Sequence, residues 1–276
     1  MKLVCSIYDI NQAEEYAKYV KYFLLDSSLI SKENVDFLNK LNVISILKIN
    51  FMVHPFEVEI WKSKIKEYIL WDCLFYITDL GMAHIFKELG AIGRVIYDPI
   101  TMLTNHLDAL EYYSYGFDAV GLSNEMPIRD VKEIISFENL KVFYQVFGYR
   151  LMFHSRRKLV SLYEEKIDKK EEHHNLRIRE ATRQESYPLV EDETGTYIYR
   201  SYVLSILKEL DGLHAEYVYL ESFQIENHVF LEVLDIFTTF LKNHDLAVAL
   251  ERMTLLNLPM QDGFTYQDTV YVKEEF

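Results

Sequence analysis

The chain has 276 residues, of which half are hydrophobic and 14% aromatic; this composition supplies a large buried core and excludes disorder over most of the length. Its formal net charge of −14 repels nucleic acid at long range, so any contact with RNA requires a local basic patch. The two distant cysteines exclude a disulfide framework, and no uninterrupted run of about 20 apolar residues predicts a membrane span, so we expect a cytoplasmic protein.

Strands and helices alternate along the first 148 residues. Apolar, strand-like segments are predicted at 2–8, 21–26, 43–50, 73–79, 94–98, 119–123 and 141–148. Helices are predicted between them at 11–20, 32–40, after 54, at 80–89, at 104–115 and after 127. Strands such as VISILKIN (43–50) are apolar on both faces, which is typical of parallel strands covered by helices.

The alternation is interrupted at 149–190. This segment begins with the basic stretch YRLMFHSRRK and continues with a highly charged run at 164–185, which we expect to form an exposed insertion. The pair His173-His174 has no carboxylate or cysteine at ligand spacing, so we expect a solvated surface there and no metal site. The pattern then resumes with a strand at 193–199, a helix at 201–210, a strand at 217–222, a helix at 227–242 and an irregular tail.

About eight strand–helix units predict a (β/α)8 TIM-barrel-like fold with a charged insertion after the seventh strand. An open doubly wound sheet would usually show a glycine-rich turn after the first strand, and residues 8–11 contain no glycine. We therefore expect one barrel domain at 1–245, including the insertion 149–190, and a C-terminal tail at 246–276 packed on the barrel.

Mostly polar residues follow the predicted strands, at the rim where barrel enzymes place their chemistry. They are Asp9, Asp26, Asn50, Thr78, Asp79, Asp98, Ser123, Asn124, Glu125, Gly148, Tyr149, Glu221 and Ser222. Such a ring predicts either a carboxylate-rich pocket or, for most single members, a helix cap or turn. Asp98 precedes Pro99 and Glu125 precedes Met126-Pro127, so these two are the least similar to caps.

The densest positive cluster of the chain follows the seventh predicted strand. Arg150, Arg156, Arg157 and Lys158 alternate there with aromatic residues that include Tyr149. Such a stretch could bind phosphates and stack a base, or pair with the carboxylates of the protein. Cys5 and Cys73 lie within apolar strands and are expected to be buried.

Two blocks resemble the collagenase-like peptidases. VFGYRLMFHSRRKLVS (146–161) matches the block V-H-G-x-x-C-M-x-x-S-x-R-C-L-x-S of that family in frame, and YPLVEDETGTYIYRS (187–201) is similar to its Y-P-x-x-E-D-E-x-G-T-Y-I-x-x-S. Glu125 and Glu221 fall on two glutamates of the family pattern. The resemblance implies a (β/α) barrel related to proteins that hydroxylate ubiquinone precursors or the wobble uridine of tRNA, often as pairs of paralogues.

Many members of that family bind an iron–sulfur cluster through four cysteines, and this sequence departs from them there. Two of the cysteine positions are occupied by Leu151 and Lys158, and no cysteine follows Cys73, so no cofactor is expected. The histidine of V-H-G is Phe147, and the arginine before Glu125 is Asn124. Fewer arginines at the rim predict weak binding of an anionic substrate such as prephenate.

These observations favour a cluster-free subunit that supports tRNA wobble-uridine hydroxylation together with a cysteine-bearing paralogue. The basic stretch with Tyr149 would then contact the RNA or the partner. One alternative is a peptidase, whose candidate catalytic residues are Asp98, Glu125, His154 and Glu221. The other is a non-catalytic barrel that binds a small ligand, and the sequence leaves open whether the chain is an enzyme.

Overall fold

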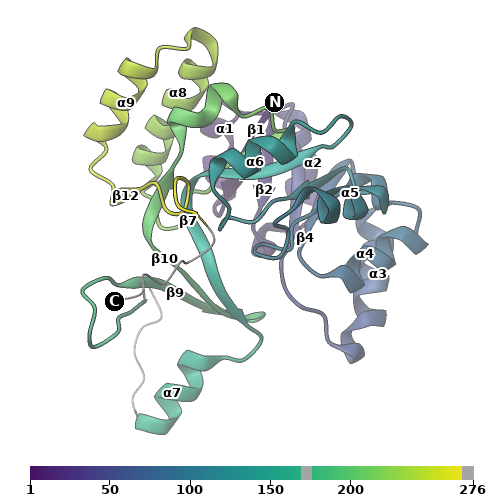
Figure 1. The fold of residues 1–276 in the computed structure, drawn as a ribbon. Helices are drawn as coiled ribbons and strands as arrows, with labels where there is room; N and C mark the ends of the chain where they lie inside the picture. Colours follow the sequence, from purple (N-terminus) through teal and green to yellow (C-terminus); the bar gives the residue numbers. More distant parts are fainter. Residues whose placement is uncertain (169–175, 269–276) are drawn as a thin grey trace, which may run out of the picture.

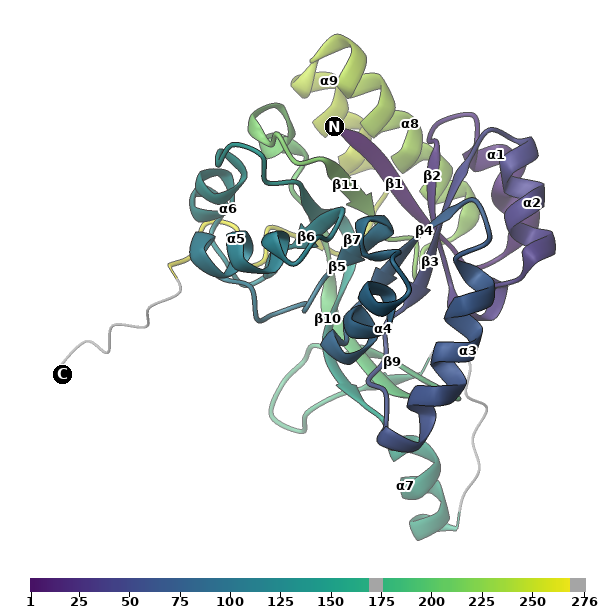
Figure 2. The ribbon, with the colours of Figure 1, turned by 90° about the vertical axis from the view of Figure 1, so that its right-hand side faces the viewer.

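The computed structural model describes residues 1–168 and 176–268 and shows eight parallel strands closed into a barrel (Figures 1 and 2). The barrel strands are β1 (Lys2–Ile7), β2 (Tyr22–Leu25), β3 (Ile44–Ile49), β4 (Cys73–Ile77), β5 (Val95–Tyr97), β6 (Ala119–Gly121), β7 (Val142–Ser155) and β11 (Tyr217–Leu220). Strand β11 pairs in parallel with both β7 and β1, which closes the barrel. The predicted (β/α)8 fold is confirmed.

Helices cover the outside of the barrel (Figure 2). They are α1 (Ala13–Tyr16), α2 (Lys32–Lys40), α3 (Val58–Tyr68), α4 (Leu80–Glu88), α5 (His106–Ser114), α6 (Ile128–Ile135), α8 (Asn227–Asn243) and α9 (Leu246–Leu255), with 3-10 turns η1 (Ile10–Gln12), η2 (Ser27–Leu29), η3 (Pro55–Glu57), η4 (Ile92–Arg94) and η5 (Leu207–Gly212). In α6 the buried residues Ile128, Val131 and Ile135 recur at helical spacing, so one face of the helix packs on the barrel.

The alternation of side chains along the strands divides the buried residues into two cores. One set points outward and packs under the helices, as Cys5 and Phe23 do. The other fills the inside of the barrel, where Tyr76, Phe143 and Tyr219 lie with neighbouring ring centroids 5.3–5.4 Å apart. Because four aromatic and five aliphatic side chains fill the inside, the barrel is a packed core that supports the residues at its rim.

Strand β7 is 14 residues long and runs beyond the barrel into an antiparallel arm. The arm contains α7 (Leu159–Ile167), β8 (Arg177–Ile178), β9 (Tyr187–Asp192) and β10 (Gly195–Ser205), and the short strand β12 (Met260–Gln261) pairs with β10. We call residues 149–205 the extension. In Figure 1 it projects from one end of the barrel with α7 farthest away.

The structure corrects two predictions for this region. The predicted strand at 193–199 belongs to β10 of the extension and not to the barrel, whose eighth strand is β11. The predicted helix at 201–210 is wrong, because β10 continues to Ser205 in register with β7 and only the turn η5 follows. Long-range pairing with β7 satisfies the backbone there and overrides the local helical pattern. The pair His173-His174 lies outside the described residues.

The C-terminal part contacts both the barrel and the extension. Helix α9 packs beside α8, β12 pairs with β10, and the carbonyl of Thr265 accepts the N–H of Ile128 at the start of α6. Residues 269–276 of the predicted tail lie outside the described part. Among the helices at 1–168 and 176–268, none combines the length and apolar character that crossing a membrane requires.

Candidate functional site

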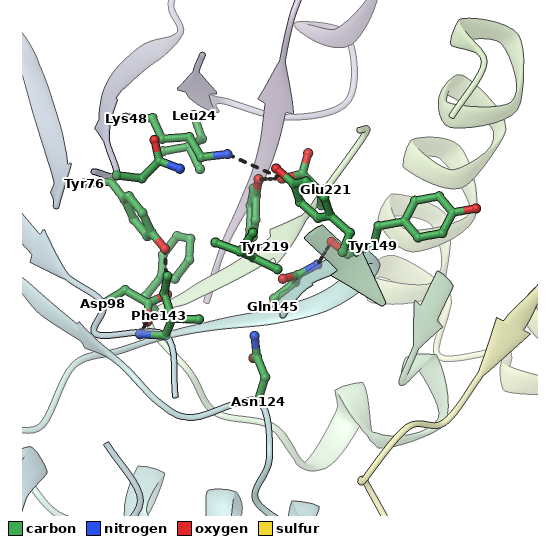
Figure 3. A pocket seen from close by; sticks show the side chains of 14 residues that line it. Leu24, Lys48, Tyr76, Asp98, Asn124, Phe143, Gln145, Tyr149, Tyr219 and Glu221 are labelled. Atoms are coloured by element: carbon green, nitrogen blue, oxygen red, sulfur yellow. Dashed lines mark hydrogen bonds and ion pairs between the residues drawn. The ribbon is translucent and has the colours of Figure 1, made fainter. Parts of the chain in front are cut away.

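A small cavity of about 50 Å³ opens at the carboxyl ends of the barrel strands (Figure 3). It is lined by Leu24, Lys48, Asn50, Tyr76, Asp98, Ile100, Asn124, Phe143, Gln145, Tyr149, Leu151, Tyr199, Tyr219 and Glu221. We call it the mouth cavity. Its walls combine tyrosine rings with amide, amine and carboxyl groups, and strands β7 and β10 carry one side of it into the extension.

Glu221 is the most strongly hydrogen-bonded group of the mouth cavity. It follows β11 and is buried, and its Oε1 accepts bonds from Ser6 Oγ at 2.6 Å, Tyr8 OH at 3.0 Å and the backbone N–H of Phe223 at 3.0 Å. Buried carboxylates require such donors, because water is not available to replace them. The first strand and the last strand of the barrel therefore meet at this side chain.

The other oxygen of Glu221 faces Tyr219 and Lys48. Tyr219 OH donates at 2.6 Å, and Lys48 Nζ forms an ion pair at 3.6 Å, which Figure 3 draws as a dashed line. Burial, together with the charge of Glu221, raises the pKa of Tyr219 and of Tyr8 well above the usual value, so both phenols remain proton donors at neutral pH. The carboxylate is held in one orientation by four side chains and one backbone N–H.

Asp98 lies across the same cavity at the end of β5. Its Oδ2 accepts from Tyr76 OH at 2.9 Å and its Oδ1 from the N–H of Ile100 at 2.8 Å. Burial raises the pKa of this carboxyl group, although the two hydrogen bonds and the positive charge of Arg150 oppose that shift. Asp98 therefore holds a proton more readily than an aspartic acid in water does.

The backbone around Asp98 is specialised. Ile100 has φ of 65°, which is strained for a β-branched residue, and its side chain lines the cavity. Gly121 of β6 lies directly beside Asp98, and a Cβ there would be 2.3 Å from Cγ of the carboxyl group. Only glycine leaves room for this carboxyl group to point into the barrel.

The predicted catalytic residues are only partly brought together. Asp98 and Glu221 line the mouth cavity, but Glu125 is exposed, is paired with Arg200 at 2.7 Å and lines a separate hollow of about 310 Å³. His154 lies in the extension, where its ring stacks on Tyr197 at 4.2 Å and burial lowers its pKa. Neither Glu125 nor His154 lines the mouth cavity.

The predicted basic patch is divided by the fold. Arg150 is 6% exposed and donates to the carbonyls of Asn124 and Gln145 at 2.8 and 2.7 Å. Arg156 binds Glu57 of η3 at 2.6 Å, and so ties the extension to the barrel. A further hydrogen bond of 3.1 Å joins Arg156 to the carbonyl of Thr194.

The rest of that predicted patch differs in exposure. Arg157 and Lys158 are exposed at the turn between β7 and α7, whereas Tyr149 is buried beside the mouth cavity. Of the residues in the predicted basic patch, Arg157 and Lys158 are therefore the two that a phosphate group could reach.

The block at 187–201 has a structural role. Glu191 of β9 accepts the N–H groups of Val160 and Ser161 at 2.7 and 3.1 Å and also the hydroxyl group of Ser161. Thr196 donates to Glu191 at 2.9 Å and accepts the N–H of Leu159. The carboxylate thus replaces a helix cap at the start of α7, where the helix dipole favours negative charge.

Several rim carboxylates act as caps, as predicted. Asp9 accepts the N–H of Asn11, Asp26 accepts that of Ser28, and Asp79 accepts those of Gly81 and Met82. Their carboxyl groups begin the helical turns after β1, β2 and β4, which explains their place in the sequence without a catalytic role.

Sequence reasoning missed most of the residues around Glu221. Lys48 interrupts the apolar strand VISILKIN, and a lysine in such a strand was a usable signal for a buried charge partner. Tyr8, Tyr76 and Tyr219 fall on the inward phase of their strands, but a tyrosine at that phase is equally typical of an ordinary core. Only the closed barrel shows that their hydroxyl groups converge on two carboxyl groups.

The residues present do not fit an iron–sulfur cluster. The chain has two cysteines, whereas such a cluster is held by about four thiolates. Cys5 and Cys73 are buried on β1 and β4, which β2 and β3 separate. Over 1–168 and 176–268, no group of three or more His, Cys, Asp or Glu side chains is arranged to hold a metal ion.

Comparison with known proteins gives a family and one curated relative. Residues 29–244 match the model of peptidase family U32. The chain is similar to tRNA hydroxylation protein P2 of Bacillus subtilis (strain 168), with 25% identity over 256 residues that cover 76% of this chain and 82% of that protein.

Among solved structures, a U32 peptidase aligns with a TM-score of 0.48 and 9% identity, over 80% of this chain and 92% of the other. Orotidine 5′-phosphate decarboxylase from Pyrococcus horikoshii aligns with a TM-score of 0.46 and 10% identity, over 86% and 99% of the two chains.

Proposed function

The chain belongs to peptidase family U32, and from this premise we propose that it supports hydroxylation of the wobble uridine of tRNA as a subunit without an iron–sulfur cluster. In this proposal it acts together with a cysteine-bearing paralogue. The observation that carries the proposal is the similarity, over most of both chains, to a protein named for tRNA hydroxylation.

The cysteine content supports the cluster-free part of the proposal. Positions 151 and 158 hold leucine and lysine, and neither side chain replaces a thiolate. Leu151 is packed in the pairing of β7 with β10, opposite Tyr199. A chain that keeps the barrel and loses the thiolates would need its redox chemistry supplied by another subunit.

The charge distribution supports a contact with RNA through the extension. Residues 149–205 carry 11 of the 29 basic and 10 of the 43 acidic residues, so this segment has a net charge of +1 and the rest of the chain −15. Phosphate binding depends on local positive charge. Arg157 and Lys158, exposed on the extension, are therefore the side chains that we assign to a nucleic-acid backbone.

The mouth cavity supports a role in holding a substrate group. Its amide side chains Asn50 and Asn124 can donate to and accept from a planar polar group, and tyrosine rings line the walls. Asp98 can supply or accept a proton there, whereas Glu221 is held by its five donors. Because the cavity is small, a substrate would have to displace side chains at the rim.

Nucleoside mass spectrometry of total tRNA tests this proposal. A deletion strain should lose hydroxylated wobble uridine and its derivatives, and the wild-type chain should restore them. Asp98→Asn should restore less than wild type, because the group that exchanges a proton is lost. An unchanged nucleoside profile, after removal of any redundant paralogue, would contradict the proposed function.

A hydrolytic function is the second candidate, favoured by the fact that Asp98 and Glu221 line one cavity. Two carboxyl groups at one cavity can activate a water molecule by general acid–base catalysis. Cleavage of a peptide library by the purified chain, lost in Asp98→Asn, would support it. No cleavage above that of the variant would exclude it.

A further inference from the structure

Helix α7 differs from the helices on the barrel because none of its nine residues is buried. Isolated helices of this length are marginal in water, and helices in folded proteins are stabilised mainly by burying an apolar face. Figures 1 and 2 both show α7 at the far end of the extension, away from the barrel. Its first turn is anchored through the N–H groups of Leu159, Val160 and Ser161, which bind Thr196 and Glu191.

The exposed side of α7 is apolar. A stripe at intervals of three to four residues consists of Leu159, Leu162, Tyr163 and Ile167, which are 36, 53, 62 and 42% exposed. Lys166 shares this face by helical spacing, and the stem of a lysine can lie along apolar surface. Further exposed apolar side chains of the extension are Met152, Phe153 and Ile178. A concentration of exposed apolar side chains is typical of a protein contact.

Charge is distributed unevenly along the helix. Arg157 and Lys158 precede its first turn, whereas its last turn and C-cap carry three acidic residues and one basic residue, Glu164, Glu165, Asp168 and Lys166. The helix dipole has the same sense, positive at the start and negative at the end. Two such helices side by side are complementary only when they run antiparallel, because the basic start of one then faces the acidic end of the other.

We propose that α7 is the contact surface for a second copy of this chain, with the two helices packed antiparallel about a two-fold axis. The contact is self-complementary, as a two-fold interface requires: each copy contributes the same stripe and both ends of the charge pattern. This inference goes beyond the proposed role in tRNA hydroxylation and does not depend on it.

The size of the surface sets the strength of the association. Two nine-residue helices bury well under the roughly 800 Å² per partner that is typical of a stable complex. We therefore expect a reversible dimer with a dissociation constant on the order of micromolar, which forms or dissociates within an accessible concentration range.

Sedimentation velocity of the full chain from about 1 to about 100 µM tests the proposal across the range of weak association. The wild-type chain should shift from monomer to dimer with concentration. Leu162→Asp should raise the dissociation constant about 100-fold, because the two-fold axis brings two introduced carboxylates, one from each copy, into the contact. Its thermal unfolding should match wild type, since Leu162 is not part of the core.

Leu70→Asp is the matched control. Leu70 is 80% exposed, but it precedes β4 and so lies at the opposite end of the barrel from the extension. This variant should dimerise as the wild type does. A general effect of an added surface carboxylate would appear in both variants.

A charge-reversal pair tests the antiparallel arrangement. Lys158→Glu alone should weaken the dimer, and adding Asp168→Lys should restore it, because the two positions face each other across the axis. Restoration would not occur if the helices ran parallel or did not touch.

A wild-type chain that sediments as a monomer over the whole range, or a Leu162→Asp variant that dimerises like wild type, overturns the inference. The proposed function is tested separately by tRNA nucleosides. If the chain is a monomer and still restores hydroxylated uridine, only the dimer proposal is contradicted. If it forms the dimer but has no effect on tRNA, only the proposed function is contradicted.

Discussion

The barrel mouth and the extension contain charged side chains in two different physical settings. At the mouth, Glu221 and Asp98 are enclosed, and neighbouring phenol and backbone groups donate to every oxygen. On the extension, Arg157 and Lys158 are exposed, and no residue of α7 is buried. The closed barrel thus fixes the carboxyl groups at the mouth, whereas the cations on the extension are positioned by a single antiparallel arm.

This difference has a consequence for stability and function. Removing a partner at the mouth leaves a buried charge without compensation, which is costly. Changing a side chain on the extension leaves the barrel core intact, so its effects should appear in local order and in binding. Mutations at the two places should separate these two behaviours, and the largest effect is expected at the mouth.

Glu221→Gln should lower the free energy of unfolding by about 3 kcal/mol, because it leaves Lys48 buried without its ion-pair partner. Urea unfolding measures this change. In the double variant with Lys48→Met the loss should be smaller than the sum of the two single losses, because the buried amine has been removed as well. Additive losses would show that Lys48 and Glu221 do not interact.

Glu191→Ala should release α7 at a cost of about 1–3 kcal/mol in local stability, because four donors lose their acceptor. Hydrogen exchange should rise at residues 159–167 and remain unchanged in the barrel strands. Lowering the pH should also increase hydrogen exchange in α7 of the wild type. Burial opposes ionisation of Glu191, but the hydroxyl and N–H donors outweigh it and lower the pKa below its usual value.

The direction of the pH effect at Glu191 follows from the linkage between proton binding and folding. A carboxyl group whose folded pKa is depressed stabilises the fold above its unfolded pKa, and the contribution is lost as the pH falls through the folded value. Protection of α7 should therefore decrease in acid in the wild type and show no such dependence in Glu191→Ala. Equal pH dependence in both proteins would exclude Glu191 as the cause.

Asp98 should contribute to stability with a pH dependence opposite to that of Glu191, and Asp98→Asn should remove this contribution. The folded pKa of Asp98 is raised, so its contribution is fully present below the unfolded pKa near 3.8 and is lost as the pH rises through the folded value. The variant has no charge to bury, so its stability relative to wild type should increase between about pH 4 and neutral pH. Paired urea titrations at several pH values measure this change.

The fold could be predicted from the sequence, whereas the site could be predicted only in part. Alternating apolar strands and helices determine a closed barrel, because eight parallel strands leave few other arrangements. The path of residues 193–205 depends on pairing with β7, which is far away in the sequence and leaves no local signal. For the same reason the buried position of Arg150 could not be read from the basic stretch that contains it.

The carboxyl groups illustrate the same limit. Asp98 and Glu221 each follow a strand, and the alternation of side chains predicts that they share the inside of the barrel. Glu125 also follows a strand, but the chain turns after Ser123 and places it outside the mouth cavity. A shift of one residue at a strand end decides whether a side chain lies inside or outside the mouth cavity. Strand ends cannot be predicted from a sequence with that precision.

Glu125→Gln should have the smallest effect, within about 0.5 kcal/mol of wild type in urea unfolding, because the Glu125 side chain is 51% exposed and water can solvate its carboxylate. The expectation contrasts directly with Glu221, although both residues fall on glutamates of the family pattern. High salt should remove even the small difference, since exposed pairs are screened. A loss as large as that of Glu221→Gln would mean that the hollow beside Phe264 is a second enclosed site, and the contrast between mouth and surface would no longer hold.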